Sequence, residues 1–146
     1  MAITAKDIRV PPAYAPGHQV APALKHGTYS AFSEEVNASS DTTPQTLFNV
    51  PANVWIEDIV LSMGTGYNGN YVILGTTGDS DCFLSDTQVA NNGTHSIKNG
   101  VNAALYRGGY LTTTKIHIRA GYDGSAGKFS ARIIYSPYAD ENYTAK

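Results

Sequence analysis

Near its end the chain alternates apolar and polar residues with a period of two, which limits what it can fold into. In the segment 128–135, the alternating apolar positions are Phe129, Ala131, Ile133 and Tyr135, and Ile134 breaks the pattern near the end. Successive side chains of a β-strand point to opposite faces, so this spacing predicts a strand with one face in a core. The segment 115–120 alternates in the same way, and glycine-rich residues separate the two. We therefore expect both segments to pair as a β-hairpin.

Further short strands are predicted along the rest of the chain, and no amphipathic helix is. Charged residues make up only 15% of the sequence, against about 25% in typical domains, and glycine is abundant. Residues 86–100 are expected to form a long loop. The predicted strands are 28–36, 46–50, 54–63, 71–75, 81–85, 105–113, 115–120 and 128–136. About eight short strands favour an all-β fold, an antiparallel β-sandwich of the jelly-roll type.

The first 25 residues differ in composition from the rest. Four prolines, Pro11, Pro12, Pro16 and Pro22, exclude a helix and disfavour a central strand. We expect residues 1–25 to form an extended proline-rich arm, 26–140 the β-sandwich domain and 141–146 a polar tail. The arm is either a frayed terminus or a segment that docks on a neighbouring subunit or another protein. Its apolar residues favour docking; they include Ile8, Val10 and Tyr14.

Length and charge restrict the range of partners. A chain of 146 residues is about one domain long. The formal net charge of −2 provides no general attraction to nucleic acid or to an anionic membrane, so neither is expected as a partner. No apolar run approaches the roughly 20 residues of a membrane helix, and no signal peptide is recognisable. We expect a soluble protein made in a cytoplasm, whose single cysteine, Cys82, is buried and unreactive.

The motifs that would indicate a catalytic, cofactor or metal site are missing or incomplete. The segment 124–128 is too short for a phosphate loop and precedes a strand, which favours a turn. The acidic residues Asp79 and Asp81 lack the spacing of a calcium loop. The histidines are not paired as metal ligands, and no serine lies in a nucleophile elbow. We expect no enzyme, no cofactor and no metal.

The polar face of the predicted hairpin is basic and is the main candidate for contacts. It would contain Lys115, His117, Arg119, Lys128 and Arg132. Such a row would suit an acidic patch on a partner, although solvated surface residues have the same pattern. The chain also has ten tyrosines, more than one small core accommodates. Some of them are expected in protein interfaces or in a sugar-binding surface.

Three segments carry a resemblance to a known family. They are 48–61 (FNVPANVWIEDIVL), 71–75 with the acidic loop after it, and 125–128 leading into the last strand. Together they resemble the small jelly-roll structural proteins of tailed bacteriophages, in particular the capsid decoration or cement proteins. The resemblance covers roughly residues 46–136, and similar sandwiches occur in head fibres and tail proteins.

The resemblance implies a function without catalysis. Such a protein would bind the outer surface of the virion's capsid, bridge subunits of the major capsid protein, and be made in the host bacterial cytoplasm. It would associate with itself, as a homotrimer in preference to a dimer. The arm would reach over the capsid protein, which makes Ile8, Val10, Pro11, Pro12 and Tyr14 contact candidates. The alternative is a carbohydrate-binding module of a head fibre or tail that uses tyrosines and Trp55 to stack on sugars.

Overall fold

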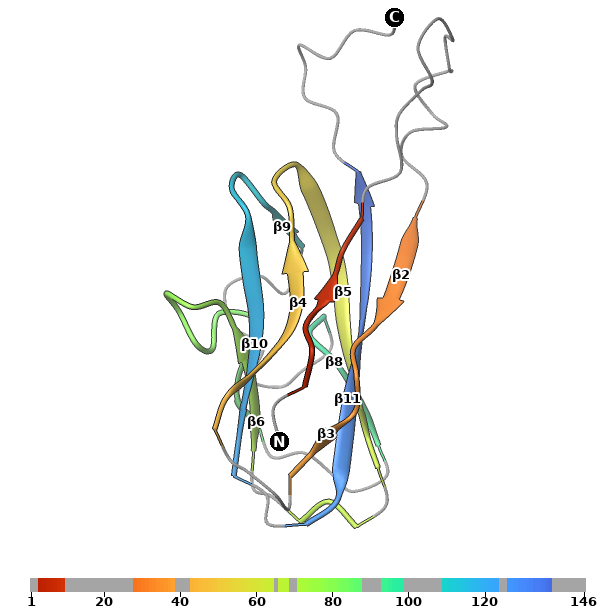
Figure 1. Ribbon diagram of the computed structural model, residues 1–146, viewed down its shortest axis with the longest axis vertical. Helices are drawn as coiled ribbons and strands as arrows, with labels where there is room; N and C mark the ends of the chain where they lie inside the picture. Colours follow the sequence, from red (N-terminus) through yellow and green to blue (C-terminus); the bar gives the residue numbers. More distant parts are fainter. Residues whose placement is uncertain are drawn as a thin grey trace, which may run out of the picture.

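The chain folds as two β-sheets packed face to face, as the computed structural model in Figure 1 shows. The structure describes residues 3–9, 28–38, 43–64, 66–68, 71–87, 93–98, 109–123 and 126–137. Within these ranges every regular element is a strand. The all-β prediction is confirmed.

Eleven strands make up the two sheets in the described part of the chain. They are β1 (Lys6–Asp7), β2 (Tyr29–Phe32), β3 (Val36–Asn37), β4 (Gln45–Val50), β5 (Val54–Met63), β6 (Val72–Gly75), β7 (Leu84–Thr87), β8 (Thr94–Ser96), β9 (Tyr110–Leu111), β10 (Ile116–Tyr122) and β11 (Lys128–Pro137). The first sheet has the order β1-β4-β10-β6-β7. The second has the order β2-β11-β5-β8, with β3 on β11 and β9 on β5.

The pairing of the strands is nested. The early strand β2 pairs with the last strand β11, β4 pairs with β10, β5 with β8, and β6 with β7. A long hairpin rolled into two sheets produces this pattern, which is that of a jelly roll. The predicted sandwich of jelly-roll type is therefore confirmed. One pair departs from the antiparallel rule, since β1 runs parallel to β4.

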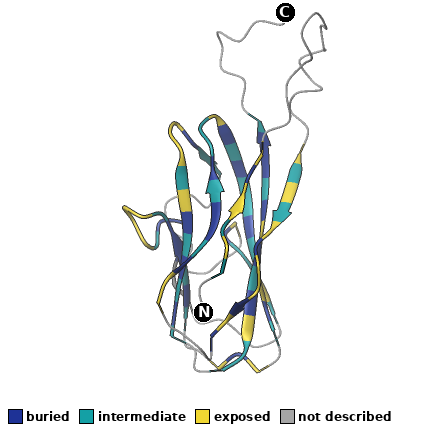
Figure 2. Ribbon diagram, in the orientation of Figure 1, coloured by how far each residue is buried: buried dark blue, intermediate teal, exposed yellow. Residues whose placement is uncertain are grey.

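Alternation along the strands builds the core between the two sheets. In β5 and β11, every second residue is buried over most of the length, so that buried and less buried residues alternate along these strands (Figure 2). The large side chains that are fully buried come from both sheets; they include Phe48, Ile56, Leu61, Ile118 and Phe129. The sandwich thus has one core and two outer faces.

The predicted hairpin is wrong, although both of its strands exist. β10 pairs with β4 and β6 in the first sheet, whereas β11 pairs with β2, β3 and β5 in the second. The connection between them crosses from one sheet to the other. Tyr122 and Phe129 therefore face each other across the core, with ring centroids 5.2 Å apart. Alternation identifies the buried face of a strand, but not whether the next strand pairs beside it or packs opposite.

The predicted strand ranges differ in how well they match. The range 54–63 coincides with β5, while 28–36 contains two strands, β2 and β3. The strand β8 lies in the expected loop 86–100, where its three polar residues gave no apolar signal. Of the predicted strand 105–113, residues 105–108 lie outside the described residues, and β9 covers 110–111.

The described beginning of the chain lies against the sandwich. The segment 3–9 includes β1, which adds to the edge of the first sheet beside β4. The side chain of Ile8 is only 4% exposed and belongs to the core. This part of the predicted arm is therefore attached to the chain's own sheets. The rest of the arm, 10–25, and the polar tail lie outside the described residues.

Candidate interaction surfaces

The outer face of the second sheet carries a row of side chains in register across four strands. Phe32 on β2 pairs with Arg132 on β11, Arg132 pairs with Val60 on β5, and Val60 pairs with Ser96 on β8. Phe32 is 64% exposed and is the only exposed large hydrophobic residue in the described ranges. A single exposed apolar side chain is common on protein surfaces. Phe32 becomes a candidate contact residue because the Arg132 guanidinium lies over its ring.

Arg132 is positioned by Phe32. Its guanidinium carbon lies 5.8 Å from the centroid of the Phe32 ring, within range for a cation–π interaction. No carboxylate of the described residues lies within salt-bridge distance of this guanidinium. A guanidinium over an aromatic ring still has its N–H donors at the rim, and these suit bidentate binding of a partner's carboxylate.

The carboxylate of Asp58, on the same outer face, already has hydrogen-bond partners. Asp58, on β5, accepts hydrogen bonds from the hydroxyl of Ser96 at 2.8 and 2.7 Å and from the amide of Ile59 at 2.8 Å. These bonds hold the carboxylate in place. The face therefore offers an exposed aromatic ring and a cation that has no carboxylate partner among the described residues, with half-buried Val60 and Ile134 beside them.

The outer face of the first sheet has a polar character. Asp7, Asn49 and His117 are aligned across β1, β4 and β10. The side-chain Nδ2 of Asn49 donates to Asp7 Oδ1 at 2.8 Å, and the side-chain Oδ1 of Asn49 lies 2.7 Å from His117 Nδ1. Because this oxygen is an acceptor, Nδ1 of His117 carries the proton. The three side chains bind the N-terminal strand to the middle of the sheet.

The five basic residues predicted to share one face do not share it. Lys115 is exposed just before β10, and His117 and Arg119 lie on β10 in the first sheet. Lys128 and Arg132 are exposed on β11, on the outer side of the second sheet. The sandwich core separates the two groups, and the expectation of one basic stripe is corrected accordingly.

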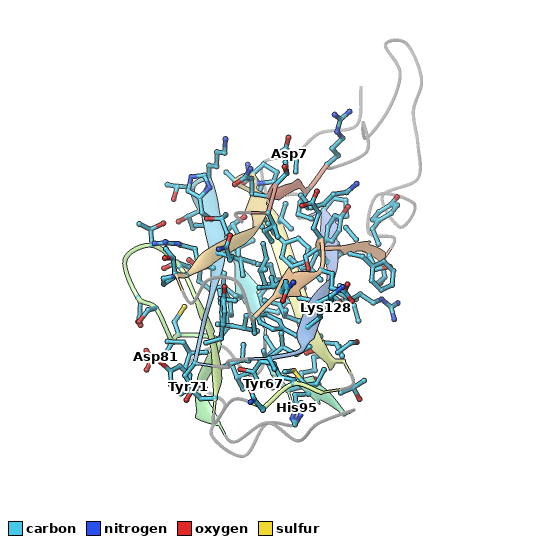
Figure 3. All side chains as sticks on the ribbon, turned by 60° about the horizontal axis from the view of Figure 1, so that its bottom comes forward. Asp7, Tyr67, Tyr71, Asp81, His95 and Lys128 are labelled. Carbon is cyan, nitrogen blue, oxygen red and sulfur yellow. The ribbon has the colours of Figure 1, made fainter. Side chains whose placement is uncertain are left out.

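Each member of the predicted set has a different environment. Lys128 lies 3.6 Å from Glu35 in an exposed ion pair, well away from Asp7 in Figure 3. Arg119 is half-buried, and its Nε has no hydrogen-bond partner within the described residues. Among the arm candidates, Ile8 is buried in its own sandwich. Val10, Pro11, Pro12 and Tyr14 lie outside the described residues.

Phe32 was not selected from the sequence, although a signal was present. It lies between Ser30 and Glu34 at a spacing of two, so the polar neighbours already assign it to the solvent side of a strand. Tyr29 and Ala31 occupy the other side and are packed against the core. An aromatic residue on the polar side of an alternating strand is the signal that would have found this site.

The single cysteine of the sequence contributes to packing. Cys82 is buried as predicted, and burial raises the pKa of its thiol to about 11, so that it stays protonated at neutral pH. No three His, Cys, Asp or Glu side chains gather as metal ligands in the described ranges. These ranges also contain no helix that is long and apolar enough to cross a membrane.

Trp55 is only partly accessible. It is half-buried on β5, and a Cβ atom at Gly109 would lie 2.3 Å from its ring. The glycine backbone therefore packs directly on the indole. This contact leaves less of the ring for stacking on a sugar, and the carbohydrate-binding alternative stays a prediction.

No family model and no curated protein matches this sequence. Two solved phage capsid structures contain a chain with this fold. A chain of the cyanophage Pam1 capsid asymmetric unit matches with a TM-score of 0.56 and 12% identity, over 85% of this chain and 91% of that one. A chain of the acid-stable capsid of Helicobacter pylori bacteriophage KHP30 matches with a TM-score of 0.56 and 16% identity, over 78% and 91%. At these identities, the similarity establishes a shared fold.

Proposed function

We propose that this chain is a structural protein of a phage virion, without enzymatic activity, that binds the outer surface of the capsid and bridges subunits of the major capsid protein. The observation that carries the proposal is the similarity in fold to chains of two phage capsids. This similarity extends over most of each chain, 85% and 78% of this one and 91% of each of the others. The protein would be made in the host bacterial cytoplasm and join the virion during assembly.

The outer face of the second sheet is the attachment surface in this proposal. Phe32 supplies an exposed apolar side chain, and Arg132 supplies an oriented cation without a carboxylate partner in the described ranges. Aromatic and arginine side chains contribute most to protein interfaces because they combine a large apolar area with directed hydrogen bonds. The matching patch on the capsid protein would have an apolar pocket next to an Asp or Glu.

Bridging would stabilise the shell by mass action. A protein that binds only the assembled lattice lowers the free energy of that lattice relative to free subunits, as any ligand does for the state it binds. Self-association into a trimer would multiply the contacts, because three linked copies bind with a high effective concentration. The proposed partners are therefore the major capsid protein and other copies of this chain.

Binding to capsids that lack this protein tests the proposal. The purified chain should sediment together with such capsids, and Phe32→Ala or Arg132→Ala should each weaken binding by at least about ten-fold, as expected of residues at the centre of an interface. His117→Ala, on the opposite outer face, is the matched control and should bind as the parent does. No binding by the parent would contradict the proposal. Equal loss in all three variants would contradict the assigned face.

A further inference from the structure

The segment 3–9 is held by bonds to both sheets. The Ile8 amide donates to the Asn49 carbonyl of β4 at 2.8 Å, and the Ile3 amide donates to the side chain of Gln45 at 3.1 Å. On the other side, the Thr4 amide donates to Glu34 Oε2 at 2.8 Å, and the Arg9 carbonyl accepts from the Tyr135 hydroxyl at 3.0 Å. The segment therefore spans the open side of the sandwich, where an edge of each sheet ends (Figure 1).

One side chain anchors the segment in the core. Ile8 is 4% exposed and belongs to the core, while Lys6 and Asp7, the two residues of β1, are exposed. The groove in which the segment lies is defined by its bond partners, which are Gln45 and Asn49 of β4, Glu34 after β2, and Tyr135 of β11. All of these bond partners lie in the part of the sequence from Glu34 to Tyr135. The same bonds would therefore form if residues 3–9 came from a second copy of the chain.

Residues 10–27, which connect the N-terminal segment to β2, are more numerous than the short distance between their two ends requires. Arg9 bonds to Tyr135, and Tyr135 is the strand partner of Tyr29, with ring centroids 6.0 Å apart. The two ends of residues 10–27 therefore lie beside the same tyrosine. Connections in compact domains have a median of about 4–6 residues. Eighteen residues reach up to about 60 Å when extended, enough to cross to a neighbouring sandwich.

The composition of this connection favours separated ends. It contains Pro11, Pro12, Pro16 and Pro22, and proline-rich sequences prefer extended conformations that keep their ends apart. If residues 3–9 dock on their own chain, both ends of residues 10–27 must lie close together, beside Tyr135. If residues 3–9 dock on a neighbouring copy, the two ends can lie far apart. Each copy still gains the same hydrogen bonds and the same buried Ile8.

We propose that residues 3–9 are exchanged between copies, so that the strand β1 of one chain fills the groove beside β4 of a second copy. Each copy then donates one strand and receives one. Two copies achieve this by reciprocal exchange, and a larger closed ring achieves it by head-to-tail exchange. Exchange between copies does not require attachment to a capsid.

A disulfide between the exchanged strand and its groove tests the proposal. Asp7 and Asn49 are strand partners on the outer face, with side chains joined by a bond of 2.8 Å. Paired residues of neighbouring strands have Cα atoms about 5 Å apart, within the range of a disulfide. The variant is Asp7→Cys/Asn49→Cys, with the buried Cys82 changed to Ser. Isotope-labelled and unlabelled chains of this variant are mixed in equal amounts and refolded together. The refolded protein is then oxidised in its native state.

Exchange predicts covalent dimers or larger species on a non-reducing gel. It also predicts that about half of the linked peptide pairs join a labelled to an unlabelled chain, as random pairing requires. Links only within a chain, or no link between native strands, would overturn the proposal. The single variant Asp7→Cys with Cys82→Ser is the control for accidental links. If the double variant does not fold, Thr4→Cys/Glu34→Cys, which joins two exposed positions of the same groove, provides the same readout.

Discussion

The rings of Tyr122 and Phe129 meet edge to face across the sandwich, with centroids 5.2 Å apart and an interplanar angle of 70°. Tyr122 ends β10 of the first sheet, and Phe129 lies near the start of β11 in the second. The ring of Tyr67 approaches Phe129 at 5.9 Å and 88°. These three rings join the two sheets at the end where the chain crosses between them. Aromatic pairs of this geometry add to the stabilisation that comes from burial alone.

Removing Phe129 should strongly destabilise the fold. Phe129→Ala leaves a cavity and two unpaired ring faces, so the free energy of unfolding should fall by about 3–5 kcal/mol. Phe32→Ala removes the same side chain from an exposed position and should change it by less than about 0.5 kcal/mol. Urea unfolding of both variants measures the difference. Equal effects would contradict the assignment of the two phenylalanines to core and surface.

Gly127→Ala should lower the free energy of unfolding far more than Gly66→Ala. Both glycines have positive φ, +86° and +85°, so either alanine incurs backbone strain of about 1–2 kcal/mol. At Gly127 the added Cβ would also lie 2.2 Å from the Tyr67 amide nitrogen, whereas at Gly66 it meets nothing within 4 Å. Thermal unfolding of Gly127→Ala should therefore show the larger loss. A similar loss in both variants would show that the crossing is not as tight as described.

The buried thiol should make stability depend on pH in alkaline solution. Burial, reinforced by the nearby Asp79 carboxylate, raises the pKa of Cys82 from 9.0 to about 11, while bonds with Thr76 oppose the shift. The folded state thus favours the neutral thiol. Its contribution is complete below pH 9.0 and is lost as the pH rises to about 11, at a cost of about 2–3 kcal/mol.

Cys82→Ala isolates this effect, since lysines and tyrosines titrate in the same range in both proteins. The free energy of unfolding of the parent should fall more steeply than that of the variant between pH 9.0 and about 11. Parallel curves would mean that the thiol is as accessible in the folded state as in the unfolded chain.

The hydroxyl of Tyr135 should hold the N-terminal segment in place. Tyr135→Phe keeps the ring but removes the bond to the Arg9 carbonyl, which should weaken the docked segment by about 1 kcal/mol. Hydrogen exchange at the Ile8 amide should then be about five-fold faster, by local opening. Tyr29→Phe is the matched control, because the Tyr29 hydroxyl has no hydrogen bond within the part of the chain that the structure describes. Unchanged exchange in Tyr135→Phe would contradict this role.

Much of the strand content followed from the sequence, because alternation reports directly on burial. The apolar positions of 128–135 and of 54–63 lie in strands with the predicted bounds or nearly so. The pairing of these strands did not follow. A five-residue connection with two glycines suits both a hairpin and a crossing between sheets. The strand pairing distinguishes the two, since β10 pairs with β4 and β6 and β11 pairs with β2, β3 and β5.

The candidate site was predicted less well for the same reason. Lys115 and Arg132 were placed on one face because a hairpin would put them there, and the crossing puts them on opposite faces. The apolar side chain of Ile8 predicts that it is covered, and it lies in the core of a sandwich. Its contact with a partner stays a prediction. Charge patterning gives no indication of Phe32, because this residue is an aromatic one on the polar side of its strand.

Cryo-electron microscopy of the virion tests the proposed function most directly. We expect density for a sandwich with the order β2-β11-β5-β8 on the outer surface of the capsid. The face with Phe32 and Arg132 should lie on the major capsid protein, and the sandwich should contact more than one capsid subunit. A virion whose capsid exterior contains no copy of this chain would contradict the proposed function.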